Sequence, residues 1–157
     1  MTRPVTGLYA HVPFCARKCS YCAFYSEPSD AQTMDRCVLC MEREILTLPD
    51  GFRPETIFFG GGTPSILNIA QWERILEALC RKGIVPAGEF TVECNPATVS
   101  LEKARLFRDM GVNRVSMGVQ SLDPRMLERL GRIHSRDMVF DSFDIFRAAG
   151  FDNVNID

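Results

Sequence analysis

The sequence alternates short apolar strands with amphipathic helices, and this alternation restricts the fold more than any other feature. Strand–helix–strand units place neighbouring strands parallel in one sheet, so the chain is predicted to be an α/β protein. The expected strands cover Gly7–Val12, Glu55–Gly60, Glu89–Cys94, Arg114–Val119 and Asn153–Asp157. The expected helices cover Ala31–Leu48, Ile69–Lys82, Ser100–Gly111, Asp123–Gly131 and a segment that starts at Ser135.

Capping residues and glycines mark the ends of these helices. Asn68 is expected to cap the second helix, and Gly83 follows its end. Pro124 stands at the first position of the fourth helix, where the missing N–H of proline is no loss. Ser135 is expected to begin the last helix. Each expected helix therefore lies between two expected strands.

The expected strands have one apolar face and one polar face, because successive side chains of a strand point to opposite sides. Along the fourth strand, Val115 and Met117 alternate with Ser116 and Gly118. The apolar face must meet the helices. The other face is polar and small, which indicates a cavity for a polar ligand rather than the packed interior of a closed (β/α)8 barrel. A solvated sheet face is the alternative.

A loop after the first strand carries three closely spaced cysteines, Cys15, Cys19 and Cys22, in the pattern C-x3-C-x2-C. Three thiolates on one loop can hold three corners of a cubane iron–sulfur cluster, which normally takes four cysteine ligands. One iron would then keep an open coordination position, where a substrate or cofactor can bind. The pattern therefore indicates a cluster that takes part in chemistry.

Two other uses of these cysteines remain open. A structural zinc would need a fourth ligand, for which His11, Cys37 or Cys40 are candidates, although zinc sites usually pair cysteines at C-x2-C spacing. A disulfide framework is the less favoured use, because it conflicts with a reducing compartment. The cysteines outside the loop are expected to be core or half-buried thiols; they are Cys37, Cys40, Cys80 and Cys94.

The composition excludes several classes of partner. The chain is 46% hydrophobic and 24% charged, which is typical of one globular domain or part of one. A net charge of −2 without a basic run gives no support for binding nucleic acid or anionic membranes. No stretch is long enough to span a bilayer, and residues 1–7 do not resemble a signal peptide. We therefore expect a cytoplasmic protein whose thiols are free or bound to metal.

Four further motifs accompany the cysteine loop, in order along the chain: Leu8–Cys15, Phe58–Ser65, Gly118–Ser121 and Leu130–His134. Together they resemble the radical S-adenosylmethionine (SAM) superfamily. Within it they resemble the oxygen-independent coproporphyrinogen III dehydrogenase and haem chaperone family. The resemblance covers essentially the whole chain. It implies a partial (β/α) barrel of parallel strands, truncated here after about five strands.

The resemblance also implies two cofactors, a [4Fe–4S] cluster and SAM. Cys15, Cys19 and Cys22 would ligate the cluster. In the family, an electron donor protein reduces the cluster, which passes an electron to the sulfonium of SAM. The carbon–sulfur bond then breaks to give methionine and a 5'-deoxyadenosyl radical. The family's SAM-contacting positions match Tyr9, Tyr21, Gly61, Gly62, Thr63, Glu93, Gln120, Arg132 and Asp157.

The chemical groups of SAM agree with this set. Its ammonium group and ribose diol need carboxylates, and its carboxylate needs a cation, for which the planar fork of arginine is suited. Without the resemblance, Arg132 would equally well be a surface arginine at a helix end, and Asp157 an edge residue. His11 is on the polar face and could also line the site. His134 is expected to be a surface or capping histidine.

Phe24 separates the two branches of the family. The decarboxylating dehydrogenase has a further cysteine two residues after the third, where this chain has Phe24. We therefore expect a haem chaperone that binds and transfers haem. The alternative is an enzyme, an oxygen-independent coproporphyrinogen III oxidase (dehydrogenase) that acts on the porphyrinogen. A zinc-stabilised interaction domain is the second alternative.

The resemblance also predicts that the chain is a fragment. Family members continue with a sixth strand and a C-terminal domain involved in tetrapyrrole binding. Residues 1–157 are therefore expected to be the N-terminal part of a radical SAM core domain.

Overall fold

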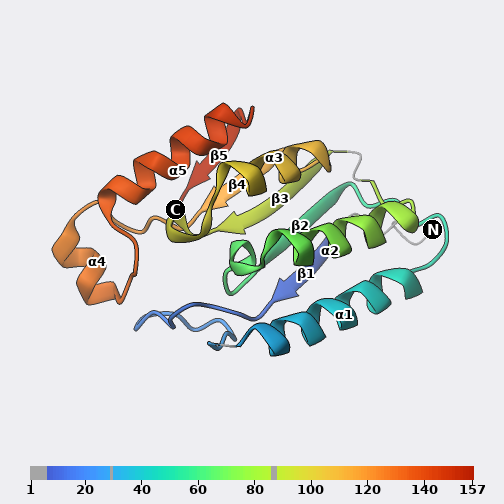
Figure 1. Ribbon diagram of the computed structural model, residues 1–157, viewed down its shortest axis with the longest axis horizontal. Coiled ribbons are helices and arrows are strands. Elements are labelled where there is room, and N and C mark those ends of the chain that lie inside the picture. Colours follow the sequence, from blue (N-terminus) through green and yellow to red (C-terminus); the bar gives the residue numbers. More distant parts are fainter. Residues whose placement is uncertain (1–6, 29, 86–87) are drawn as a thin grey trace, which may run out of the picture.

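The computed structural model describes residues 7–28, 30–85 and 88–157, and it contains one five-stranded parallel sheet in the order β1-β2-β3-β4-β5 (Figure 1). The strands are β1 (Gly7–Val12), β2 (Thr56–Gly61), β3 (Glu89–Cys94), β4 (Arg114–Met117) and β5 (Asn153–Ile156). The helices are α1 (Ala31–Thr47), α2 (Ile69–Arg81), α3 (Leu101–Asp109), α4 (Pro124–Leu130) and α5 (Arg136–Ala148). The α/β class and the parallel sheet are confirmed. Residues 1–6, on which the prediction about a signal peptide rests, lie outside the described residues.

The bounds of three strands differ slightly from the prediction. β2 lies one residue further along, β4 ends at Met117 rather than Val119, and β5 ends at Ile156 rather than Asp157. The end of β4 has a local cause. The N–H of Val119 donates to the carbonyl of Met117 (2.9 Å), which turns the chain away from the sheet. Gln120 then has a φ of 67°, in the left-handed region that a strand cannot continue through.

The predicted helix caps are present. Asn68 caps α2 through a capping box, in which its side chain accepts from the N–H of Gln71 while the side chain of Gln71 accepts from the N–H of Asn68. Asp123 caps α4, with Pro124 at the first helical position, and Ser135 caps α5. Helices α2, α3 and α4 each start shortly after the carboxyl end of a strand, whereas α1 follows the cysteine loop and α5 follows α4.

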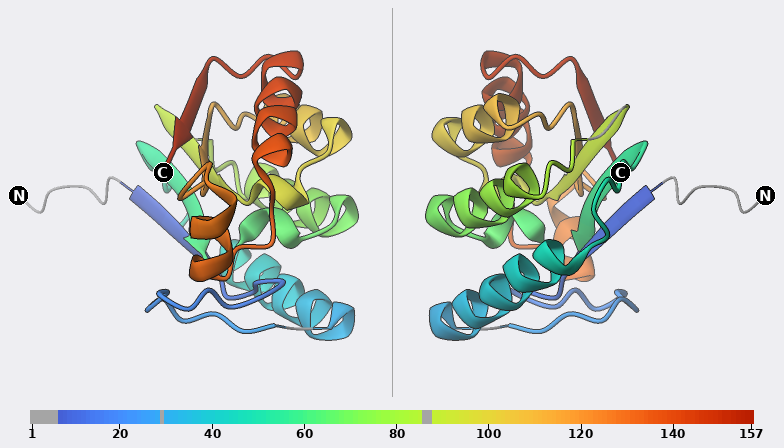
Figure 2. Two further views of the ribbon diagram at one scale, coloured as in Figure 1. Left: turned by 90° about the vertical axis from the view of Figure 1, so that its left-hand side faces the viewer. Right: turned by 90° about the vertical axis from the view of Figure 1, so that its right-hand side faces the viewer.

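Four helices, α1, α2, α3 and α5, cover one face of the sheet, and the opposite face is left open (Figure 2). The core lies between the sheet and these helices. Its centre is an aromatic row in which Trp72 packs edge-on against Phe59, with ring centres 5.1 Å apart, and against Phe107, with ring centres 4.8 Å apart. Within the described part of the chain, no helix is both long enough and apolar enough to cross a membrane.

The open face carries the polar residues predicted for it. Strand register aligns Glu93 with Ser116, and Ser116 with Asn155, across β3, β4 and β5. A second row contains Phe58, Thr91 and Arg114 in neighbouring strands. β1 and β5 are the two edges of the described sheet, so it is a partial barrel that does not close on itself. We call this open face the inner face.

Candidate functional site

The cysteine loop joins β1 to α1 and is shaped by its own backbone hydrogen bonds. The N–H of Cys15 donates to the carbonyl of Glu27 (3.1 Å), and the N–H of Glu27 donates to that of Pro13 (2.9 Å). A turn brings the N–H of Cys22 to the carbonyl of Cys19 (3.2 Å). All three predicted cluster cysteines are free and half-buried. The loop therefore holds its thiols close to the protein body.

The helix α4 lies against this loop. The N–H of Ser20 donates to the carbonyl of Leu130 (3.3 Å), and its hydroxyl donates to that of Arg129 (3.2 Å). Gly131 ends α4 in the left-handed conformation, with a φ of 72°, and its α-carbon faces the backbone of Cys19 and Ser20. Residues about 110 positions apart in the sequence thus enclose the cysteines.

Cys15, Cys19 and Cys22 line one cavity together with Thr63 and Arg132. The hydroxyl of Thr63 lies 3.5 Å from the sulfur of Cys15. The guanidinium Nη1 of Arg132 donates to the sulfur of Cys19 (3.3 Å), and its Nη2 donates to the carbonyl of Gly118. The Nε of Arg132 is buried without a hydrogen-bond partner. Arg132 therefore lies inside the site rather than at a surface helix end.

The candidate fourth ligands of a zinc ion do not line this cavity. His11 packs its ring over Gly61, and Cys37 and Cys40 belong to α1. Among residues 7–28, 30–85 and 88–157, no three Cys, His, Asp or Glu side chains converge as they would around a single metal ion. A single zinc ion needs all of its ligands within about 2.3 Å of one point, whereas each cysteine of a cubane cluster binds a different iron atom. The three thiols of a cubane site therefore need not converge on one point.

The glycines Gly60, Gly61 and Gly62, at the end of β2, form a cradle in which no side chain would fit. A β-carbon on Gly62 would lie 2.6 Å from the carbonyl oxygen of Phe14, and one on Gly61 would overlap the ring of His11. Gly61 has a φ of 108°, which favours glycine. The N–H of Gly62 donates to the carbonyl of Val12 (2.8 Å). The cradle is thereby joined to the start of the cysteine loop.

Glu93 reaches over this cradle from β3. Its Oε2 accepts from the N–H of Gly61 (3.2 Å), and a β-carbon on Gly60 would lie 2.9 Å from the same oxygen. Burial raises the pKa of Glu93, and the negative charge of Asp157 raises it further, while the N–H of Gly61 and the nearby His11 act in the opposite direction. The two carboxylates therefore share one polar site.

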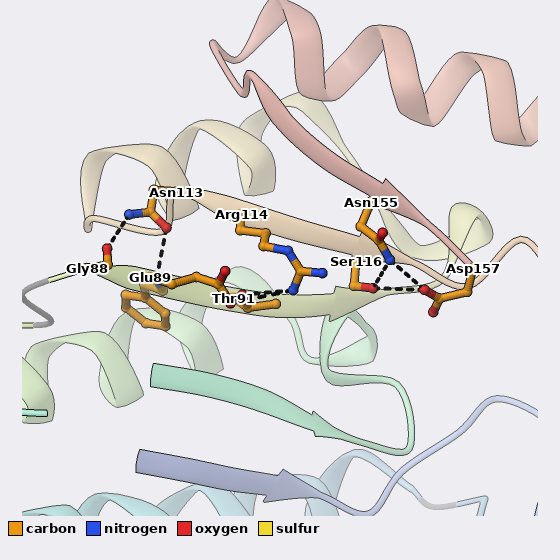
Figure 3. A network of polar contacts seen from close by, with 9 residues as sticks. Gly88, Glu89, Thr91, Asn113, Arg114, Ser116, Asn155 and Asp157 are labelled. Carbon is orange, nitrogen blue, oxygen red and sulfur yellow. Dashed lines mark hydrogen bonds and ion pairs between the residues drawn. The ribbon is translucent and has the colours of Figure 1, made fainter. Parts of the chain in front are cut away.

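Asp157 is held by a polar network on the inner face (Figure 3). Its Oδ1 accepts from the hydroxyl of Ser116 (3.2 Å) and from the side-chain amide of Asn155 (2.6 Å). Its backbone carbonyl accepts from the N–H of Gln120 (2.9 Å). Gln120 is a non-glycine residue with a positive φ, and such strain is concentrated at functional sites.

All nine residues expected to contact SAM line a single cavity of about 460 Å³ on the inner face. The residues that this cavity shares with the cysteine cavity are Tyr21, Cys22, Gly61, Gly62, Thr63, Asn95 and Arg132. The two cavities are therefore adjoining. The alternative of a merely solvated sheet face does not hold for this region.

Sequence reasoning missed several lining residues, among them Phe58 and Asn95. Phe58 alternates with Gly60 toward the inner face, and its ring stacks on Tyr9 with centres 5.9 Å apart. Asn95 directly follows β3, where parallel sheets place ligand-binding residues. Strand alternation could have found the first, and strand position could have found the second.

Several minor expectations change. His134 is predicted to lie on the surface, but only 4% of its surface is exposed. Its Nε2 donates to the carbonyl of Val119, at 3.0 Å. The prediction that Cys40 and Cys80 are core or half-buried is wrong, because both are exposed on the outer sides of α1 and α2. Cys94 is buried as expected, and burial raises the pKa of its thiol to about 12. His11 packs over Gly61 beside the inner-face cavity without lining it.

The donor set fits the two implied cofactors. Three free thiols on one cavity provide the sulfur ligands that iron–sulfur clusters use. The adjoining cavity offers the carboxylates of Glu93 and Asp157 for cationic or hydroxyl groups. It also offers the guanidinium of Arg132, whose buried Nε has an unused donor, for a carboxylate.

Comparison with known proteins supports the same family. The Radical SAM superfamily model matches residues 9–157. The chain is 38% identical over 154 residues to a protein named Heme chaperone HemW from Bacillus subtilis, covering 95% of this chain and 41% of the relative. It is 40% identical over 133 residues to radical S-adenosyl methionine domain-containing protein 1, mitochondrial, from Bos taurus, and the match covers 82% of this chain and 30% of the relative.

A solved structure is also similar. Coproporphyrinogen III oxidase (HemN) from Escherichia coli, described as a radical SAM enzyme, superposes with a TM-score of 0.85 at 30% identity and covers 98% of this chain and 36% of that one. The chain spans about two fifths of the length of the HemW relatives it matches. The family model, the relatives and the fold agree, and the chain belongs to the radical SAM superfamily, for which a [4Fe–4S] cluster and SAM are the implied cofactors.

Proposed function

We propose that this chain is the cofactor-binding part of a haem chaperone that carries a [4Fe–4S] cluster and SAM. The observation that supports the cofactor sites most strongly is the pair of adjoining cavities. One is lined by the three free cysteines, and the other by all nine residues expected to contact SAM. No single residue of the set would carry the proposal alone.

Cys15, Cys19 and Cys22 would hold the cluster, which supplies one-electron chemistry when it is bound and reduced. Arg132 would bind the carboxylate of SAM. Glu93, whose Oε2 accepts from the N–H of Gly61, would orient the amino end of SAM through its carboxylate. The remaining contacts would come from Tyr9, Tyr21, Gly61, Gly62, Thr63, Gln120 and Asp157.

Haem transfer is proposed from two observations. Several relatives at 30–38% identity over nearly the whole chain bear the name haem chaperone. Position 24 is a phenylalanine with 68% of its surface exposed, where the decarboxylating branch is expected to have a cysteine. The alternative, oxidation of coproporphyrinogen III, is favoured by the similarity to the Escherichia coli oxidase.

The cofactor proposal is tested by anaerobic reconstitution of the natural-length protein with iron and sulfide. Electron paramagnetic resonance of the reduced protein is then recorded with and without SAM. We expect about four irons per chain and a signal that shifts on addition of SAM. Cys19→Ala should lose both, while Cys80→Ala, which removes an exposed cysteine on α2, should keep both. Stoichiometric zinc, or a cluster indifferent to SAM, would contradict the proposal and favour a zinc-stabilised interaction domain.

A second experiment separates the two functions. The reconstituted protein is incubated in one assay with haem and an apo-haemoprotein, and in another with coproporphyrinogen III, SAM and a reductant. A chaperone should bind haem and transfer it, and leave the porphyrinogen unchanged. Consumption of coproporphyrinogen together with release of methionine would instead identify the oxidase.

We also propose that residues 1–157 are the N-terminal part of a longer radical SAM core domain, supported by the coverage of about two fifths of the relatives. Haem or porphyrinogen contacts would then lie largely in the remainder. A coding sequence that stops at codon 157 would contradict this. An electron donor protein is the further partner that the cluster needs, and a reducing cytoplasm suits the free thiols.

A further inference from the structure

Lys103 is a lysine whose side chain is buried. The residue exposes 9% of its surface, and lysines are almost never buried without a compensating partner. It is the third residue of α3. Its Nζ donates to the carbonyl of Ser65 (2.7 Å) and to the carbonyl of Thr98 (3.0 Å).

This position is unfavourable for a cation in three ways. Lys103 lies in the first turn of α3, at the positive end of the helix dipole. Burial lowers the pKa of its ammonium group. In the described part of the chain, no carboxylate forms an ion pair with it. The two hydrogen bonds to the carbonyls of Ser65 and Thr98 are the interactions that offset this cost.

The two carbonyls belong to the loops that follow β2 and β3. Ser65 lies in the short helix η1 (Pro64–Ile66), directly after the glycine cradle, and Thr98 lies in η2 (Pro96–Thr98). The loops are also joined directly: the hydroxyl of Ser65 accepts from the N–H of Asn95 (3.0 Å) and lies 2.5 Å from the hydroxyl of Thr98. We call Ser65, Asn95, Thr98 and Lys103 the loop hub.

The loop hub borders the cofactor cavities through Asn95 and Thr98. Thr63, two residues before Ser65, lines both cavities and contacts Cys15. Asn95 also lines both, and Thr98 lines the cysteine cavity. A shift of either loop would therefore change the shape of both cavities at once.

We propose that Lys103 is a positioning residue, which fixes the two loops after β2 and β3 in the conformation that receives the cofactors. The inference rests on the proposed binding of SAM in the adjoining cavity. Lys103 does not line either cavity. Its effect on binding is therefore transmitted entirely through the two carbonyls.

The test compares two variants of the natural-length protein. Lys103→Met keeps the length of the side chain but removes the ammonium group. Phe107→Leu changes a fully buried residue four positions further along α3, in contact with Trp72 rather than with the loops. SAM affinity is measured by titrating the paramagnetic signal of the reduced cluster. Hydrogen exchange of residues 61–66 and 95–98 is measured in the cofactor-free protein.

We expect Lys103→Met to bind SAM about tenfold more weakly and to exchange faster in both loops, because two charge-assisted hydrogen bonds are lost. Phe107→Leu should lower the melting temperature without changing either quantity. If the two variants match in SAM affinity and loop exchange, Lys103 acts only on the fold and the inference is wrong.

Failure of the proposed function would look different. A wild-type protein that binds no SAM would overturn the function, while loop exchange in the cofactor-free protein would still decide the role of Lys103. If Lys103→Met does not fold, Lys103→Gln replaces it, because glutamine keeps a donor but is too short to reach both carbonyls. Unchanged loop exchange in that variant would overturn the inference.

Discussion

Glu93 is a carboxyl group that the fold partly buries beside a second carboxyl group, that of Asp157. Burial, and then the charge of Asp157, raise the pKa of Glu93 above its ordinary value of 4.5. As the pH rises from 4.5 to this raised pKa, the folded protein keeps a proton that the unfolded chain releases. The free energy of unfolding therefore falls as the pH rises through this interval. Above the raised pKa, the folded protein carries an unfavourable buried charge.

Glu93→Gln should therefore have opposite effects on stability and on binding. The cofactor-free variant should melt at a higher temperature than the wild type at neutral pH, and this difference should disappear below about pH 4.5, where Glu93 is protonated in both states. SAM affinity should fall about tenfold or more, because a charge-assisted contact to the amino end of SAM is lost. Thermal melts from pH 4 to 8 and a SAM titration check the two effects.

Glu89→Gln is the matched control for this prediction. Glu89 lies on the same strand and face as Glu93, but it accepts from the hydroxyl of Thr91 (2.6 Å) and lies near Arg114, outside the SAM cavity (Figure 3). The control should leave SAM affinity unchanged. A wild-type affinity in Glu93→Gln would remove Glu93 from the proposed site.

Individual residues show what sequence alone could predict about the site. Glu93 and Gln120 were predicted by motif resemblance, while strand alternation predicted the polar face that Ser116 and Gly118 share. His134 and Lys103 were not predicted. Lys103 is buried against the carbonyl of Ser65, and His134 against that of Val119. These contacts join different segments of the chain, so the local sequence around a polar residue does not predict them.

At the scale of elements, α4 and the cysteine loop form one unit. Asp123 caps this seven-residue helix by accepting from the N–H groups of Arg125 and Met126, at 2.8 and 3.1 Å. A helix this short depends strongly on its caps, because nucleation is unfavourable. Its last carbonyls in turn hold Ser20 between Cys19 and Cys22. Fraying of α4 should therefore loosen the cluster site.

Asp123→Ala tests this coupling. The variant should lose about 1 kcal/mol of stability, as is typical for removal of an N-cap. It should also retain less cluster after desalting and lose it faster in the presence of a chelator. The measurements are iron content and the decay of the cluster absorbance with time.

Asn68→Ala provides the comparison, because it removes the cap of α2 and not that of the helix bound to the cysteine loop. It should cost a similar free energy while cluster retention stays at the wild-type level. Equal cluster loss in both variants would mean that retention follows overall stability, with no special role for α4.

The sequence predicted the positions of the helices and strands better than it predicted the contacts between them. Caps such as Asn68 and Ser135 and the alternation in β4 predicted the order of elements. The early end of β4 was missed because the apolar Val119 continues the strand pattern, while the turn is made by the positive φ of Gln120. The contact of α4 with the cysteine loop has no sequence signal, since it joins segments about 110 residues apart.

At the scale of the whole molecule, the fold separates stability from function. Helices cover one face of the sheet and form the core there (Figures 1 and 2). The inner face carries the cavity and the polar network around Asp157 (Figure 3). Carboxylates and a partly unpaired arginine on the inner face contribute little to stability before a ligand is present. A ligand that satisfies them should therefore stabilise the protein as a whole.

Thermal unfolding with and without SAM tests this separation in the natural-length, cluster-loaded protein. A ligand that binds only the folded state adds about 2.7 kcal/mol at a concentration of 100 Kd, so the melting temperature of this domain should rise by several degrees. Cys19→Ala should show little of this rise, because it lacks the cluster that completes the site. Cys80→Ala should show all of it, since Cys80 is exposed on α2 and outside both cavities. An equal rise in Cys19→Ala would mean that SAM binds without the cluster, and that the two adjoining cavities work independently.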